Sequence, residues 1–250
     1  MILQALPALD STIFLLLVLL WGLLLFGGFA LGKVNTDGTH RIPTPARMGS
    51  SITLVVFAWG WFLSAQTHQS AAVAQLGLFT ALGMSLGFVG DLFMARLIPL
   101  GEPVFGGIGA FGLGHVFYII GLWGLGDALS LNEAGSRWGA LLVGLAIGAL
   151  FWYLVVWRGG SRSSLHLIAL PYALLLAGTF GVASGLALHN GVFLPVALGA
   201  LLFLLSDLLL AAQLFNSLHF RLIGDVVWFT YGPGQMLIVT SLAAAVILGG

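Results

Sequence analysis

Two acidic residues stand inside long apolar runs of a chain in which only 6% of the residues are charged. Asp91 lies in one hydrophobic stretch, and Asp207 lies in another much further along the chain. An ionisable side chain within an apolar segment of this length is costly to bury and by default indicates a functional site. Two carboxyl groups in a site of low dielectric differ in how readily they ionise, so a pair can supply a proton donor and a proton acceptor. Such a pair suits the hydrolysis of an acid-labile bond in a lipid that enters from the bilayer.

The spacing of polar residues is the same after both aspartates. Asp91 and His115 are 24 positions apart, and so are Asp207 and Tyr231. This coincidence predicts a parallel internal repeat of four helices plus four helices, related by an axis along the membrane normal. The two aspartates would then face each other across that axis.

Hydroxyl, imidazole and amide groups accompany the two carboxyl groups. Any one such residue is about as often a contact between membrane helices as part of a site. The two aspartates and these five residues together make seven polar side chains at one depth on four helices, which favours a shared pocket instead. The sequence therefore predicts catalytic roles for Asp91 and Asp207, and substrate-binding or orienting roles for His115, Tyr118, Ser206, Tyr231 and Gln235.

The composition is that of a membrane protein. Of the 250 residues 60% are hydrophobic and the mean hydropathy is +1.10, whereas soluble domains are about 45–50% apolar and about 25% charged. Eight acidic and eight basic residues balance, so the net charge gives no indication of a nucleic-acid partner. The absence of cysteine excludes disulfides and thiolate chemistry.

Hydrophobic runs divide the chain into membrane-spanning segments. A helix needs about 20 apolar residues to cross the hydrocarbon core, and no polar linker suggests a domain boundary. The first run lacks the basic start of a signal peptide, so we expect a retained helix. We predict one all-α, polytopic membrane domain over residues 1–250, with eight transmembrane helices at roughly 11–31, 49–66, 71–95, 104–126, 138–157, 165–188, 192–215 and 225–248.

The distribution of basic residues predicts the orientation of these helices. With eight spans, the loops that follow odd-numbered spans share one side, and the opposite side holds only Arg137. This asymmetry predicts a cytoplasmic side for the basic loops and an extracytoplasmic position for both termini, in the cell (inner) membrane. All seven candidate site residues then lie in the cytoplasmic half of the bilayer. The basic side carries Lys33, Arg41, Arg47, Arg96, Arg158, Arg162 and Arg221.

Other classes of protein share some of these sequence features with a lipid hydrolase. A carrier without catalysis also has intramembrane acids and helix interruptions such as Gly232-Pro233-Gly234, but its polar residues should lie at the midplane. An intramembrane aspartyl protease has a Gly-Asp element like Gly90-Asp91, but the surrounding residues and the order of motifs differ. A histidine-rich zinc site is not expected, because the histidines other than His115 lie at helix ends or in loops.

The motifs around the two aspartates resemble those of the YhhN-like membrane proteins, whose members include lysoplasmalogenases. The matching elements are Gly90-Asp91-Leu92, then Phe111, His115 and Tyr118, then Phe203, Ser206, Asp207, Leu210 and Ala211, and finally Tyr231 and Gln235. The family usually has a Lys-Pro element before its second helix, where this chain has an Arg41 to Arg47 segment with two prolines. This departure leaves the head-group preference open.

The resemblance implies cleavage of the vinyl-ether bond of a lysoplasmalogen, which gives a fatty aldehyde and a glycerophospho-alcohol. Protonation of the alkene carbon, addition of water and collapse of a hemiacetal would need two carboxyl groups and no metal or organic cofactor. Asp91 and Asp207 would share these roles in either order. The expected partner is a lysophospholipid-type substrate in the bilayer. Arg96, Arg158 or Arg221 could meet its phosphate, although topology is the simpler explanation for these arginines.

Overall fold

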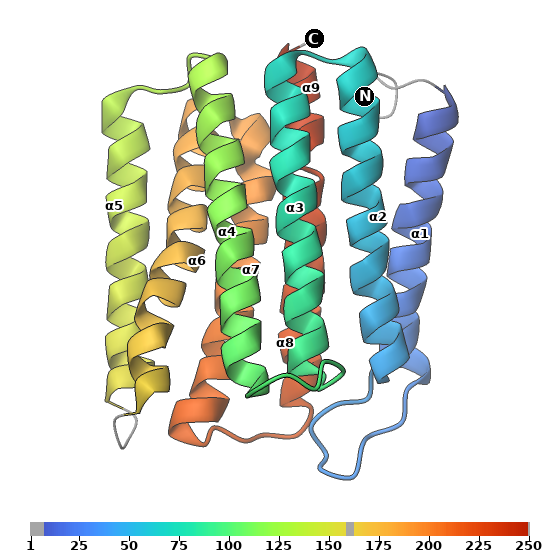
Figure 1. Ribbon diagram of the computed structural model, residues 1–250, viewed down its shortest axis with the longest axis vertical. Coiled ribbons are helices and arrows are strands. Elements are labelled where there is room, and N and C mark those ends of the chain that lie inside the picture. Colours follow the sequence, from blue (N-terminus) through green and yellow to red (C-terminus); the bar gives the residue numbers. More distant parts are fainter. Residues whose placement is uncertain (1–7, 159–162, 250) are drawn as a thin grey trace.

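Long α-helices make up nearly all of the computed structural model, which describes residues 8–158 and 163–249 (Figure 1). Eight segments are long and apolar enough to cross a membrane, and the described residues contain no strand. The prediction of an all-α protein with eight spans is thereby confirmed. In chain order the elements are α1 (Ala8–Leu31), α2 (Thr44–His68), α3 (Ala71–Met94), α4 (Pro103–Ala128), α5 (Ala134–Phe151), the π-helix η2 (Trp152–Trp157), α6 (Ser164–His189), the 3₁₀ helix η3 (Gly191–Phe193), α7 (Leu194–Asn216), α8 (Ile223–Val239) and α9 (Ser241–Gly249).

The helix boundaries differ from the sequence-based expectation mainly at α2. This helix begins at Thr44 rather than at residue 49, because Pro43 occupies the N-cap and a second proline lies in the first turn. Proline is well tolerated there, since its missing N–H would have no partner within the helix. The earlier start places Arg47 within α2 instead of in the preceding loop.

The loops fall into two sets at opposite ends of the bundle. Figure 1 shows the α1–α2, α3–α4 and α7–α8 connections and the facing ends of η2 and α6 at the lower end, and the start of α1 and the end of α9 at the upper end. The basic residues therefore gather at the lower end, as the alternation of spans predicts. Arg162 lies outside the described residues. Those that the structure describes at this end are Lys33, Arg41, Arg47, Arg96, Arg158 and Arg221.

The eighth span is the central element of the bundle. It comprises α8 and α9, which meet at Thr240, and 72% of its most apolar stretch is buried, against 17% for the span that contains α5. The α8 helix packs against α7, α2 and α3. It therefore lies beside both helices that carry the two aspartates, which allows its side chains to reach either one.

Helices in the two halves of the chain pack in the same order. The α2 helix packs on α3 as α6 packs on α7, and α3 packs on α4 as α7 packs on α8. Consecutive hairpins produce this order with or without a repeat. The 4+4 internal repeat therefore stays a prediction.

Glycines on α3 make room for polar side chains from neighbouring helices. A Cβ atom at Gly83 would lie 2.2 Å from the ring of Tyr118, and one at Gly87 would lie 3.0 Å from Nε2 of Gln235. Small residues let membrane helices approach closely. The glycines of α3 thus determine how near Tyr118 and Gln235 come to the aspartate on the same helix.

We expect Gly83→Ala to lower the thermal unfolding temperature of the purified protein by several degrees. The added methyl group overlaps the ring of Tyr118, and overpacking of this kind typically costs about 1–3 kcal/mol. Gly124→Ala on α4 is the matched control, because no atom lies within 4 Å of its added Cβ. Equal melting temperatures for the two variants would contradict this account of the α3–α4 contact.

Candidate active site

A polar cavity lies between α2, α3, α7 and α8, near the end of the bundle that carries the basic residues. Asp91 of α3 and Asp207 of α7 both line it, together with Ser206, Tyr231 and Arg47. Its volume is about 180 Å³, which is room for several water molecules. The two aspartates, distant in sequence, therefore border one space that is large enough to hold water.

Asp91 is buried and is held by hydroxyl groups from two other helices. Ser51 Oγ donates a hydrogen bond to its Oδ2 at 2.5 Å, and the Tyr231 hydroxyl donates to the same oxygen at 3.0 Å. The chain of contacts continues inward: Gln235 Nε2 donates to the Tyr231 oxygen at 2.9 Å, and the Tyr118 hydroxyl donates to Gln235 Oε1 at 3.3 Å. Donors that converge on one oxygen fix the orientation of the carboxyl group and leave Oδ1 without a hydrogen-bond partner among the described residues.

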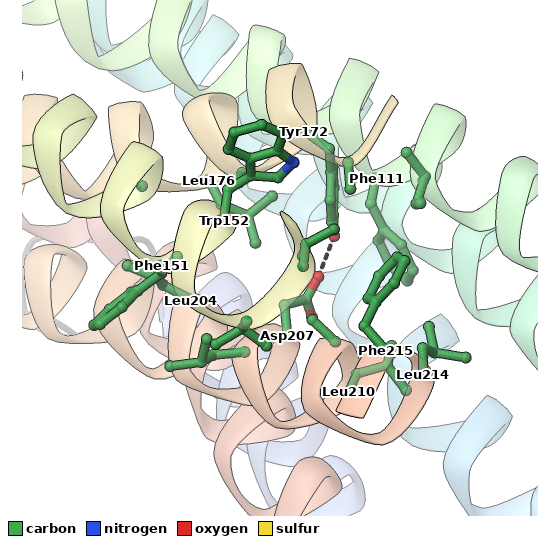
Figure 2. Close-up of a pocket in the computed structure, with 18 of the residues that line it drawn as sticks. Phe111, Phe151, Trp152, Tyr172, Leu176, Leu204, Asp207, Leu210, Leu214 and Phe215 are labelled. Carbon is green, nitrogen blue, oxygen red and sulfur yellow. Dashed lines mark hydrogen bonds between the residues drawn. The ribbon is translucent and has the colours of Figure 1, made fainter. Parts of the chain in front are cut away.

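Asp207 is held in a similar way from the other side. The hydroxyl of Tyr172, on α6, donates to its Oδ2, and Figure 2 shows these two side chains pointing toward each other. Ser206 Oγ approaches Oδ1 at 3.3 Å and also donates to the backbone oxygen of Phe203 at 2.7 Å. Each aspartate thus accepts a hydrogen bond from one tyrosine and has a serine hydroxyl beside its carboxyl group.

An apolar groove adjoins the polar cavity at Asp207. Side chains of α4, α5, η2, α6 and α7 line it, and Figure 2 shows aromatic and leucine side chains around Asp207 and Tyr172. The groove and the cavity share four lining residues, so they are adjoining parts of one site. These shared residues are Met94, Phe111, Asp207 and Leu210.

The π-helix η2 borders this groove. Trp152 and Val156 contribute to the lining, and the Trp152 indole N–H donates to the backbone oxygen of His166 at 2.9 Å. π-Helical turns are rare and occur frequently at functional sites. Here the turn contributes Trp152, Val155 and Val156 to the wall of the groove that Asp207 also lines.

The structure brings some candidate residues to the cavity and places others behind it. Asp91, Asp207, Ser206 and Tyr231 line the cavity. Gln235 and Tyr118 do not line it, and they reach Asp91 only through Tyr231. Their expected orienting role would therefore be indirect.

His115 lies away from both carboxyl groups. Its Nδ1 is 2.9 Å from the hydroxyl of Thr179 on α6, and its ring packs edge-on against Phe203 at 4.6 Å. It does not line the cavity, and its Nε2 has no hydrogen-bond partner among the described residues. A role of His115 in orienting water stays a prediction that this geometry does not favour.

Sequence reasoning missed two direct partners of the aspartates and one cation. Ser51 and Tyr172 carry no motif, although Tyr172 is one of only four tyrosines and stands in an apolar run. Arg47 was assigned to a loop, but it lies in α2 and lines the cavity. By contrast Arg96, Arg158 and Arg221, the arginines considered for phosphate contacts, are exposed and do not line it.

The fold and the site define a multi-pass helical membrane protein with two carboxyl groups in a cavity inside its bundle. Residues 45–242 match the sequence profile of the YhhN family, so the chain belongs to that family. The match includes every residue that lines the polar cavity. No curated protein and no solved structure gave a significant match. Within the described ranges, no three His, Asp or Glu side chains gather as a metal site would require.

Proposed function

We propose that this YhhN-family protein is an intramembrane lipid hydrolase, resembling lysoplasmalogenase, that cleaves the vinyl-ether bond of a lysoplasmalogen. The observation that carries the proposal is the position of Asp207, which borders both the apolar groove and the polar cavity. An amphiphile with its chain in the groove and its head group in the cavity has the bond between them beside both carboxyl groups. The products are a fatty aldehyde and a glycerophospho-alcohol.

The proposed reaction begins with protonation of the alkenyl chain. The protonated carboxyl group of one aspartate gives its proton to the second carbon of the chain, and the electron pair of the double bond forms the new C–H bond. The positive charge is then shared between the first carbon and the ether oxygen. The other aspartate, as a carboxylate, stabilises this charge and accepts a proton from the water that attacks the first carbon. The resulting hemiacetal loses the glycerol oxygen, which takes up a proton, and the aldehyde is released.

The positions of the two carboxyl groups support a division of roles. The carbon that receives the proton is on the chain side of the ether, and Asp207 is the aspartate that borders the apolar groove. The attacking water must come from the polar side, where Asp91 lines the cavity but not the groove. We therefore assign proton donation to Asp207 and activation of water to Asp91.

Tyr172→Phe should lower kcat about tenfold. The substitution removes the hydroxyl that orients the Asp207 carboxyl group and leaves the apolar ring in the groove. Because Asp207 is protonated when it donates its proton, this hydrogen bond joins neutral groups and contributes up to about 1.5 kcal/mol, which corresponds to the expected factor. Tyr153→Phe is the matched control, since Tyr153 is exposed on η2 and does not line the groove. A wild-type kcat for Tyr172→Phe would show that this hydrogen bond does not prepare Asp207 for catalysis.

The proposed activity is tested with two lipids that differ only in one double bond. Purified protein is incubated with 1-alkenyl lysophosphatidylethanolamine and, separately, with the saturated 1-alkyl ether, and fatty aldehyde is measured. We expect aldehyde from the alkenyl lipid alone. No aldehyde from folded protein would contradict the proposal and favour the carrier alternative, for which uptake into proteoliposomes is the direct assay.

A cytoplasmic position of the basic end is part of the proposal. The described loops and helix ends that carry the basic excess lie at this end of the bundle (Figure 1). The polar cavity is lined by Arg47, Ala95 and Gly224, which lie near the same ends of α2, α3 and α8. Single cysteines introduced into a chain that has none can be labelled from one side of intact cells. We expect a cysteine in the α3–α4 loop to be protected from an impermeant reagent and one in the α4–α5 loop to react.

A further inference from the structure

Arg47 is a cation of the basic end that borders the polar cavity. It lies in the first turn of α2, and its guanidinium carbon is 5.6 Å from the centre of the Trp228 ring, which also lines the cavity. Arginine commonly stacks on aromatic faces in this way. The side chain is therefore held at the cavity wall from one side and faces the space that contains both aspartates.

The hydrogen-bonding capacity of Arg47 is largely unused. Its Nη2 donates to Thr44 Oγ1 at 3.0 Å, but its Nε is buried and has no hydrogen-bond partner among the described residues. Nearby Arg41 differs, since its Nε is 2.7 Å from Asp225 Oδ2 and its backbone N–H also donates to that carboxyl group. Within residues 8–158 and 163–249, Arg47 forms no ion pair.

A buried donor without a partner requires an explanation, because native proteins satisfy most such groups. The carboxyl groups of Asp91 and Asp225 attract Arg47 electrostatically, but neither lies close enough to form an ion pair with it. An anion in the cavity beside Arg47 would supply an acceptor and a counter-charge at hydrogen-bonding distance, which no described side chain provides except Thr44 as an acceptor. The guanidinium group presents its N–H donors in a planar fork that matches the oxygens of a phosphate.

His40, in the α1–α2 loop, adds no positive charge beside Arg47 at neutral pH. Burial, together with the nearby positive charge of Arg47, lowers the pKa of the His40 imidazole below its ordinary value. The charge available to an anion on this side of the cavity is thus that of Arg47.

We propose that Arg47 binds the phosphate of the amphiphile's head group and makes the site prefer a phosphate-bearing lipid to a neutral one. The inference rests on the proposed function only for the placement of the lipid, with its head group in the polar cavity. The phosphate would lie at the α2 side of the cavity, and the hydrocarbon chain in the groove beyond Asp207. This position keeps the bond to be cleaved between Arg47 and the groove.

The test measures equilibrium binding of two saturated ethers that the protein cannot hydrolyse. One is radiolabelled 1-hexadecyl lysophosphatidylethanolamine and the other is 1-hexadecylglycerol, which has the same chain and no phosphate. Wild type should bind the phospholipid more tightly, and Arg47→Gln should reduce that preference about 10- to 100-fold, through the loss of a charge-assisted contact. Arg96→Gln, which removes an exposed arginine from the same end of the bundle, should retain it.

Each outcome of this assay decides the proposal. If Arg47→Gln weakened the binding of both lipids equally, Arg47 would act as a counter-charge for the aspartates. This result would overturn the proposed phosphate contact. Displacement of the phospholipid by inorganic phosphate at an equal concentration would overturn the lipid head group as the source of the anion. If Arg47→Gln does not fold, Arg47→Lys keeps the charge without the fork and should lose part of the preference. Phosphate-dependent binding without any aldehyde production would overturn the proposed hydrolase activity and leave this inference intact.

Discussion

Asp91→Asn and Asp207→Asn should each lower the rate of aldehyde formation from an alkenyl lysophospholipid about 10²- to 10⁴-fold, which is the usual contribution of a positioned acid or base. Both carboxyl groups line the same cavity, and a tyrosine hydroxyl donates a hydrogen bond to each. An amide preserves the shape of the side chain but can neither donate the proton nor accept one from water. Initial rates at saturating substrate measure the effect on kcat.

Asp127→Asn is the control for the loss of an acidic side chain. Asp127 is exposed near the end of α4, at the other end of the bundle, and pairs with Arg137. The rate of aldehyde formation by the Asp127→Asn variant should stay within a factor of about two of wild type, since surface ion pairs contribute little to stability. Wild-type rates for correctly folded Asp91→Asn and Asp207→Asn proteins would rule out the two-carboxylate mechanism. Binding of the saturated ether should survive in both variants.

Ala211→Phe should reduce kcat/KM for a lipid with a sixteen-carbon chain about 50-fold and shift the preference toward shorter chains. Ala211 lines the apolar groove on α7, one turn beyond Asp207. A phenyl ring there excludes part of the chain, and each excluded methylene costs about 0.8 kcal/mol of burial. Exclusion of about three methylene groups accounts for the expected 50-fold fall in kcat/KM. Rates measured over a series of chain lengths give the shift in preference.

Ala212→Phe separates blockage of the groove from a general disturbance of α7. The neighbouring residue is also half-buried, but it does not line the groove. Its chain-length profile should match wild type. The same profile for both phenylalanine variants would mean that the hydrocarbon chain does not lie in this groove.

The fold was predictable because the membrane imposes a simple rule on the sequence. A span must be apolar over about 20 residues, and the eight runs end within a few residues of the observed helices except at the start of α2. There the two prolines, Pro43 and Pro45, predict a loop from composition alone, although proline at the N-terminus of a helix is favourable. That boundary decided whether Arg47 belonged to a loop or to the cavity wall.

The site was predictable only where a polar residue is conspicuous in an apolar helix. Asp91, Asp207 and Tyr231 stand out in this way, and the structure places all three on one cavity. Ser51 is missed because serine is common in membrane helices, so its type gives no signal. Which face of a helix a residue occupies depends on packing between helices, so the contact of His115 with α6 could not be derived from its spacing to Asp91.

Deuterium incorporation tests the central claim most directly. The alkenyl lysophospholipid is hydrolysed by the purified protein in heavy water, the aldehyde is reduced at once to the alcohol, and the product is analysed by mass spectrometry. Protonation of the alkene carbon predicts one deuterium on the second carbon of the product chain. Because release of an enol would also place a solvent hydrogen on that carbon, kcat/KM is measured in ordinary and in heavy water as well: rate-limiting transfer of a proton to the carbon predicts a lower value in heavy water, and equal values would contradict the proton donation assigned to Asp207.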